Sequence, residues 1–476
     1  MLTRLKISGF KNLHSVDLRF GFFTCIAGPN GVGKSNLFDA IQFLSDLSNL
    51  PIAKAVDRVR GMSGKSVSIA SLFGANDEGT ISDIEFLVEA VVPKKIVDEY
   101  SQEAEVTSTC LEYKLALRLL RGEVSSNKSD RIEIVHEELR PRSRAAVKSE
   151  WKFVGAEKAL NFVDGKRTTP FIETKLDAGI TKIFLRSDNP DISLNSGAPP
   201  RVPLTTPRTV LSGVDSISHA SQLALRREMQ SWRLLQLEPS ALREPDSYRS
   251  DSHISVRGEH LPAAVYRIGL EADVAADLAK LVRGIETVEV ISNDLLELRT
   301  LVVTMNRTTF PASALSDGTL RFLALSVMAC DPEGAGLVCM EEPENGIHPT
   351  KIPEMIDLVK NLSDVYMLDE LDPARSSVLR QVIINTHSPL VVAEVNTEDL
   401  LFAQAWQKGR LRSVAYKPVH DTWRAKALKA DEACVFLGEI ESFLSGNPAS
   451  SSTKRGKGSR VRDLFGKDSS TQRLDF

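Results

Sequence analysis

The sequence predicts an α/β fold in which a mixed sheet flanked by helices is joined to an antiparallel β lobe and a helical insert. Near the N-terminus, a continuous apolar strand at residues 22–28 runs into a glycine-rich loop and then an amphipathic helix. Far downstream, apolar strands at residues 336–340 and 381–386 are separated by a helical segment, as in buried parallel sheets. Between these regions, residues 80–182 show the alternation typical of antiparallel strands.

The remaining elements of the first half follow from local patterns. Residues 5–7 and 16–20 flank a turn-like segment and are expected to pair as antiparallel strands. Alternating apolar residues predict the strands of the β lobe at residues 81–92, 110–120 and 131–139. Five prolines between residues 187 and 207 rule out a long helix in that stretch.

The second half begins with helical patterns at residues 219–232 and 273–285. They are followed by predicted strands at residues 288–292 and 296–305. A terminal hairpin is expected at 399–416, and a single helix from about Arg424 to Leu444. Beyond Ser445 the chain is rich in Ser, Gly and Lys, which predicts disorder.

These patterns divide the chain into five segments. They are the N-terminal part of the core, the β lobe with the helical insert, the C-terminal part of the core, a C-terminal helix, and a basic tail, at residues 1–80, 81–290, 291–416, 417–446 and 447–476.

Composition narrows the class of protein. The formal net charge of −4 gives no overall basic field for nucleic acid. The five cysteines have no C-x-x-C spacing, which argues against a zinc site and a disulfide framework. No signal-like or bilayer-spanning apolar run is present, so we expect a cytoplasmic protein with no membrane partner.

The glycine-rich loop has the features of a phosphate-binding loop. It reads Gly28-Pro29-Asn30-Gly31-Val32-Gly33-Lys34-Ser35, and it follows a strand and opens a helix. In such a loop, backbone N–H groups surround the phosphates, Lys34 reaches the β- and γ-phosphates, and Ser35 ligates Mg²⁺. The alternative is an ordinary glycine turn that caps a helix.

Paired carboxylates end the apolar strand at 336–340. Glu341 is placed to enter the Mg²⁺ shell, and Glu342 to activate the water that attacks the γ-phosphate. The alternative is a solvated acidic loop, because Glu344 follows closely.

One further motif opens a predicted helix, and another ends a predicted strand. Ser316, Asp317 and Gly318 precede an apolar helix, where they form either a helix cap or an anion site. His387 follows the strand at 381–386. A lone histidine there is usually structural, but in this motif order it can contact the γ-phosphate and position water.

In this order the motifs resemble the ATP-binding-cassette heads of the SMC, RecF and OLD class of ATPases. Within that class the chain is similar to the stand-alone bacterial ATPases of the AAA_21 and AAA_15 kind. The likeness is carried by "FKNL", "IAGPNGVGKSNLFDAIQFLS", "LEPSALREPDSY", "HLPAAVYRI", "LSDGTLRFLAL", "EEPENGIHP" and "INTHSP", which span most of residues 1–401.

The resemblance implies ATP and Mg²⁺ as cofactors and a role for each motif. Glu341 matches the Mg²⁺ carboxylate, Glu342 the catalytic glutamate and His387 the switch histidine. Ser316 and Gly318 match the signature loop, which in this class touches the γ-phosphate held by the opposite subunit. The residues that match the nucleotide loop and the nearby N-terminal turn are Asn30, Gly31, Val32, Gly33, Lys34, Ser35, Asn36, Phe10, Lys11 and Asn12.

The chain departs from the class pattern at two points. Glu341 replaces the more usual Asp, giving a longer arm that should still reach Mg²⁺. No Q-loop glutamine is evident, because Gln42 lies on the helix that follows the loop.

Two functions remain open. The first is an ATPase, dimeric or of higher order through ATP, that senses or regulates a separately encoded effector, a nuclease or toxin, in phage defence. The second is a RecF-like clamp that binds DNA in repair. A basic run at Lys454, Arg455, Lys457, Arg460 and Arg462 slightly favours a DNA or RNA partner, although such a run is usually only a solvated tail.

Other members of the class are excluded by the sequence. The insert lacks the sustained heptads of SMC coiled coils. No Asp-x-Asp follows His387, so no OLD-type nuclease is expected in this chain.

Overall fold

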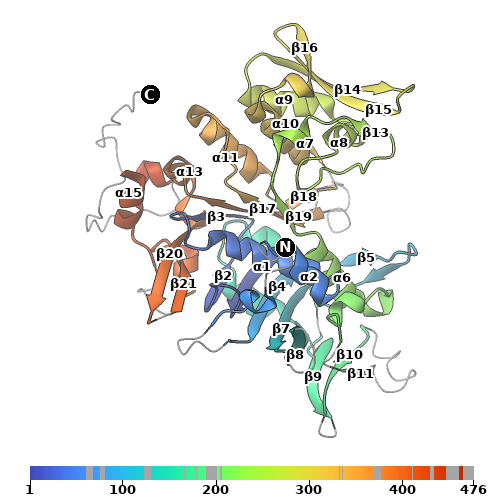
Figure 1. Ribbon diagram of the computed structural model, residues 1–476, viewed down its shortest axis with the longest axis vertical. Helices are drawn as coiled ribbons and strands as arrows, with labels where there is room; N and C mark the ends of the chain where they lie inside the picture. The colour runs from blue at the N-terminus through green and yellow to red at the C-terminus, as the bar shows by residue number, and fades with distance from the viewer. Residues whose placement is uncertain are drawn as a thin grey trace.

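The computed structural model describes most of the chain (Figure 1). The described residues are 1–60, 68–75, 81–122, 130–165, 167–177, 180–188, 201–203, 206–331, 333–334, 336–363, 365–367, 377–409, 411–428, 434–445 and 460–464. Among the described helices, none has the length and apolar character needed to cross a bilayer.

A seven-stranded mixed sheet forms the centre of the described structure, in the order β12-β17-β19-β3-β20-β21, with β18 beside β19. Four neighbouring pairs, from β12 through β20, are parallel, and the β20–β21 hairpin is antiparallel. The strands are β3 (Phe23–Ala27), β12 (Arg233–Leu235), β17 (Gly336–Glu341), β18 (Val365–Met367), β19 (Ser377–Thr386), β20 (Leu400–Lys408) and β21 (Leu411–Pro418). The predicted α/β class with a mixed sheet is therefore confirmed.

Both faces of this sheet are buried, which explains the unbroken apolar pattern of β3. Ile26 and Ile383 point into one core with the helix α1 (Lys34–Leu47). Cys25 and Ile384 point into a second core on the other face. That core includes the helices α8 (Leu261–Ile268), α9 (Glu271–Leu281), α10 (Asp317–Cys330), α11 (Ile352–Asn361) and α13 (Pro389–Glu394).

An eight-stranded antiparallel sheet lies on the α1 side, in the order β11-β10-β9-β8-β7-β4-β1-β2. The predicted β lobe thus shares one sheet with the N-terminal hairpin. Three aromatic rings pack together where this sheet meets α1, with centroids 5.7–6.2 Å apart: those of Phe10, Phe43 and Phe86. The strands are β1 (Leu2–Ser8), β2 (Val16–Arg19), β4 (Ile84–Val91), β7 (Cys110–Leu120), β8 (Arg131–Pro141), β9 (Ile172–Asp177), β10 (Ile180–Leu185) and β11 (Arg201–Pro203).

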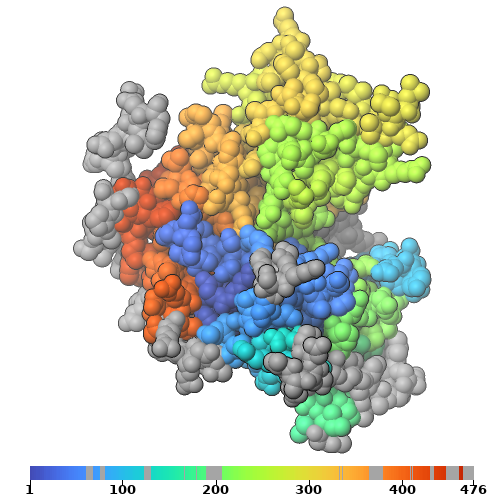
Figure 2. All heavy atoms as spheres, in the orientation of Figure 1, coloured from blue at the N-terminus to red at the C-terminus, as the bar shows by residue number. Residues whose placement is uncertain are grey.

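A four-stranded sheet lies at the opposite end of the molecule, beyond α8 and α9 (Figures 1 and 2). Its strands are β13 (Asp246–Ser247), β14 (Ile285–Asn293), β15 (Leu298–Met305) and β16 (Thr308–Pro311). A separate ribbon is formed by β5 (Lys95–Val97) and β6 (Glu103–Glu105). The other described helices are α2 (Ile52–Arg58), α3 (Arg144–Glu150), α4 (Ala156–Leu160), α6 (Ala220–Gln230) and α7 (Pro239–Leu242).

The C-terminal region differs from the single helix expected from Arg424 to Leu444. Two short helices are present instead, α14 (Trp423–Lys426) and α15 (Leu437–Ser445). Between them, the buried Val435 forms a parallel bridge with Val419, which a continuous helix could not do. Long-range pairing with the end of β21 therefore overrides the helical pattern.

The predicted basic tail is also ordered where it is described. Residues 461–464 form a turn of 3₁₀ helix with Val461 fully buried. Arg460 pairs with Asp357 and Glu394, so this arginine belongs to a packed surface and not to a solvated tail. Residues 446–459, with Lys454, Arg455 and Lys457, and residues 465–476 lie outside the described residues.

Candidate nucleotide-binding site

The glycine-rich loop connects β3 to α1 and has backbone conformations that require glycine. Gly31 and Gly33 have φ angles of 76° and 109°. A Cβ on Gly33 would lie 2.3 Å from the Asn12 amide nitrogen, so a side chain at this position would displace Asn12 from the turn. The loop thus turns tightly into the first turn of α1, as phosphate binding needs.

Lys34 lies over this loop. Its ammonium group donates hydrogen bonds to the Gly28 carbonyl at 2.6 Å and the Pro29 carbonyl at 2.8 Å. Burial lowers the pKa of Lys34 from its usual value, opposed by the nearby carboxylates of Glu342 and Glu344. The cation therefore sits between the loop and the acidic edge of the sheet.

The N-terminal turn lies against the loop. The Asn12 amide donates to the Val32 carbonyl at 3.1 Å and accepts from the Asn36 amide at 2.8 Å. From the C-terminal hairpin, the Tyr416 hydroxyl donates to the Gly33 carbonyl at 3.2 Å. Two regions distant in sequence thus hold the loop in shape.

Ser35 and Glu341 lie close together at the end of β17. Burial would raise the pKa of Glu341, but hydrogen bonds from Arg60 and the Ser35 hydroxyl hold it below its usual value. Asn385 also donates to this carboxylate, at 3.3 Å. The two predicted Mg²⁺ ligands are therefore neighbours, and Glu341 is held as the anion that a metal ion requires.

Arg60 joins the metal ligands to a further carboxylate. Its guanidinium donates to both oxygens of Glu341, at 2.6 and 3.1 Å, and to the Ser35 carbonyl at 2.9 Å. Its Nε donates to Asp39 at 2.5 Å, and Lys11 pairs with the other oxygen of Asp39 at 2.7 Å. Lys11, Asp39, Arg60 and Glu341 form one chain of alternating charges.

Glu342 and His387 form a direct pair beside this network. His387 Nδ1 lies 2.6 Å from Glu342 Oε1, and the Asn345 amide donates to Glu342 Oε2 at 2.9 Å. Glu342 has a φ angle of 46°, uncommon for a residue with a side chain, and its N–H donates to the Asn385 carbonyl at 2.9 Å. The backbone turns sharply after Glu341, so the two glutamates point to different partners.

The predicted signature residues lie elsewhere. Ser316 caps α10 by accepting from the Thr319 N–H at 3.2 Å. Arg321 on the same helix donates to the Asn345 carbonyl at 2.6 Å. A Cβ on Gly318 would lie 3.2 Å from the Gly346 carbonyl oxygen. The start of α10 therefore contacts the turn that follows Glu342, and the described hydrogen bonds of Ser316 do not reach the Gly31–Ser35 loop.

Sequence reasoning missed five residues of this site: Asp39, Arg60, Asn345, Asn385 and Tyr416. Asp39 had a signal, because it lies four residues after Ser35 and so on the same face of α1. Asn385 could also have been found, because it lies within the motif "INTHSP" that carries the family resemblance. Arg60 and Tyr416 are brought in by tertiary packing alone.

The residues of this site fit a Mg²⁺-bound nucleotide. A serine hydroxyl and a carboxylate are the hard oxygen ligands that Mg²⁺ takes, with phosphate and water completing its shell. The loop provides backbone N–H groups at the start of α1, and Lys34 provides a cation for the phosphates. Within the described residues, no cluster of three or more His, Cys, Asp or Glu side chains could hold a metal ion independently.

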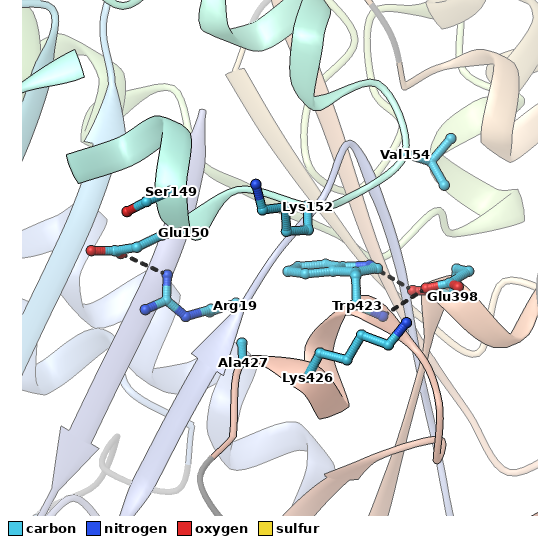
Figure 3. A pocket seen from close by; sticks show the side chains of 9 residues that line it. All are labelled: Arg19, Ser149, Glu150, Lys152, Val154, Glu398, Trp423, Lys426 and Ala427. Atoms are coloured by element: carbon cyan, nitrogen blue, oxygen red, sulfur yellow. Dashed lines mark hydrogen bonds and ion pairs between the residues drawn. The ribbon is translucent and has the colours of Figure 1, made fainter. Parts of the chain in front are cut away.

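A cavity of about 960 Å³ lies away from this site, between β2, α3 and α14 (Figure 3). Among its lining groups, Arg19 and Glu150 form an ion pair, and Glu398 accepts hydrogen bonds from the backbone and ring N–H groups of Trp423. None of the predicted site residues lines it. The glycine-rich loop therefore remains the candidate nucleotide site.

The comparisons with known proteins agree with these motifs. The family AAA_21, described as "AAA domain, putative AbiEii toxin, Type IV TA system", matches residues 23–169 and 172–393, well over half of the chain. The chain belongs to the AAA_21 family. The predicted resemblance to P-loop ATPases of the SMC and RecF class is thereby confirmed, while the roles of individual residues stay predictions.

Two kinds of relative are similar to this AAA_21 chain. The DNA replication and repair protein RecF of Bacteroides fragilis is 48% identical over 46 residues, which span 10% of this chain and only 12% of RecF. An SMC head bound to the C-winged helix domain of ScpA covers 88% of this chain and 98% of its own, at 14% identity and a TM-score of 0.45. The SMC head of Thermotoga maritima covers 88% and 99%, at 12% identity and a TM-score of 0.37. These matches are too short or too weak to add anything to the assignment of the chain to the AAA_21 family.

Replacing Lys34 with alanine should weaken ATP binding by about 10- to 100-fold, because a charge-assisted contact to the phosphates is lost. Lys54→Ala, which removes an exposed lysine of α2, is the matched control and should bind ATP as the parent does. Titration of a fluorescent ATP analogue measures both affinities. Equal affinity in the parent and Lys34→Ala would refute the assignment of the loop.

Proposed function

We propose that this chain binds and hydrolyses ATP between two copies of itself, and that the resulting motion regulates a separately encoded effector, a nuclease or toxin, in bacterial phage defence. The observation that carries the proposal is the Glu342–His387 pair, which lies beside Lys34, Ser35 and Glu341 at one edge of the central sheet. The family description refers to a type IV TA system, which supports a role in a system that has more than one protein.

The side chains suggest a division of labour. Glu342 is oriented by His387 and Asn345, so one carboxylate oxygen can accept a proton from the attacking water. Lys34 and the loop N–H groups stabilise charge on the phosphates. Mg²⁺, held by Ser35 and Glu341, would neutralise phosphate charge. Because Arg60 donates to both oxygens of Glu341, a metal ion at that carboxylate would have to share these oxygens with Arg60 or displace it.

The position of Ser316 supports a site shared between copies. Ser316 and Asp317 are exposed at the start of α10, and the Ser316 hydroxyl bonds within its own helix turn, so this helix start is open to another chain. Arg243, which donates to Asp317 at 2.6 Å and to the Leu315 carbonyl at 2.9 Å, holds this loop in place. A two-fold dimer would then place each signature loop against the nucleotide of its partner.

A RecF-like DNA clamp is the second candidate, favoured by the 48% identity over 46 residues to a RecF protein. The net charge of −4 and the ion pairs of Arg460 and Arg462 with acidic residues weigh against it.

Glu342→Gln should lower the ATP turnover rate by at least about 100-fold while leaving ATP affinity unchanged, because a general base is lost without a change of size. Glu238→Gln, an exposed glutamate paired with Arg257, is the matched control. Phosphate release and analogue binding are measured on the same samples. Turnover at the parent rate in Glu342→Gln would exclude Glu342 as the base.

A Ser316→Arg chain and a Lys34→Ala chain should each be inactive alone and recover activity when mixed. In an equimolar mixture about half of the dimers are mixed, each with one intact composite site, so about a quarter of the parent turnover is expected. Ser316→Thr keeps the helix cap and serves as the control. No recovery from variants that are folded and associate would argue against the shared site.

Two measurements on the purified chain distinguish regulation of an effector from a DNA clamp. If the chain regulates an effector, it should show no ATP-dependent DNA binding, and it should not cleave plasmid or RNA in the presence of ATP, Mg²⁺ and Mn²⁺. DNA binding that needs ATP and weakens steeply with salt would instead support the clamp. Cleavage abolished by a mutation in this chain would contradict both.

A further inference from the structure

The strand β14 is an unusually open edge. It runs for nine residues without proline and pairs with β15 on one side, and among the described residues no strand pairs with its other side. A row of backbone N–H and C=O groups is therefore free to bond to another strand, an arrangement that proteins usually prevent at long edges.

The turn after β14 carries exposed apolar side chains. Leu295 and Leu296 are 96% and 66% exposed, and Ile291 on β14 is 54% exposed. The turn is well formed, because the Asn293 side chain accepts from the N–H groups of both leucines at 3.1 Å. The leucines are thus held outward by a fixed backbone.

The same surface is acidic. Four exposed acidic residues lie on β14 and its turn, and none takes part in a described ion pair: Glu286, Glu289, Asp294 and Glu297. Glu286 accepts a hydrogen bond from the Arg307 N–H and Asp294 accepts one from the Tyr248 hydroxyl. The nearest cation on β15, Arg299, is turned away onto the rings of Tyr248 and Tyr266, at 4.9 and 4.1 Å. An extended segment with basic side chains would match this edge, whereas nucleic acid would be repelled.

We propose that β14 and the turn 294–297 form a docking site for an extended, basic and partly apolar segment of a partner protein, which adds as a strand beside β14. A second copy of this chain fits less well, because full antiparallel overlap of two β14 strands would bring Glu289 opposite Glu289. This inference rests on the proposed function, because the protein that binds β14 is taken to be the separately encoded effector.

The site is joined to the ATPase machinery through one core. Val288 of β14 lies in the same buried cluster as Leu278 of α9 and Leu323 of α10. Helix α9 packs against β14 and against α10, the helix that begins at the signature residues. A strand bound at β14 would therefore move together with the signature loop.

The test uses the full chain and a synthetic peptide of about nine residues in which valine and lysine alternate, with a valine–glutamate peptide for comparison. We expect the lysine peptide to bind, the glutamate peptide not to bind, and amide hydrogen exchange to slow at residues 285–293. Glu289→Lys and the double variant Leu295→Ser, Leu296→Ser should each weaken binding about tenfold. Leu176→Ser, at a leucine of β9 that is 73% exposed, is the matched control and should not.

Three results would overturn the proposal: equal binding of both peptides, protection only outside 285–293, or protection of β14 that grows with protein concentration without peptide, which would assign the edge to a second copy. ATP turnover of the parent chain is measured in the same samples. A chain that binds the peptide but does not hydrolyse ATP would refute the proposed function alone.

Discussion

The shared register of three parallel strands is the constraint on which the site depends. Glu341 of β17 lies opposite Asn385 of β19, which lies opposite Ile26 of β3. All three strands therefore end at the same edge of the central sheet. The residues that follow them are Glu342, His387 and the glycine-rich loop. A slip of one residue would turn Glu341 and Asn385 to the opposite face of the sheet. The buried Gln381 further fixes β19, because its side chain bonds to both backbone groups of Leu2 and to the Gly21 carbonyl.

The charges at this edge stabilise one another. Asp39 and Glu341 are largely buried anions, and Arg60 lies between them while Lys11 covers the far oxygen of Asp39. Removing Arg60 would leave Glu341 with weaker partners and raise the pKa of its carboxyl. The network thus keeps the Glu341 carboxyl ionised, in the form that a metal ion would need.

The proposed site of ATP hydrolysis and the proposed partner-binding site lie on different sheets. Hydrolysis is proposed at the loop edge of the central sheet, whereas β14 lies on a different sheet at one end of the molecule (Figure 1). The second core links the two, since it contains residues of β17 and β19 as well as α10 and β14. Close packing in such a core transmits rigid-body shifts of helices, so α10 is the natural connection between nucleotide and partner.

The sequence alone determined the motifs whose residues are neighbours along the chain, together with the elements that contain them. Buried strands can be recognised in a sequence as unbroken apolar runs. Three motifs could be found because each follows such a strand: the Gly28–Ser35 loop, the Glu341–Glu342 pair and His387. Tertiary structure decided the rest. Arg60 and Tyr416 reach the site through pairings that leave no periodic signal, β1 and β2 join the β lobe through strand order, and the bridge from Val435 to Val419 interrupts the expected C-terminal helix. Local patterns record which side chains are buried, but only the folded chain determines which distant residues are buried against one another.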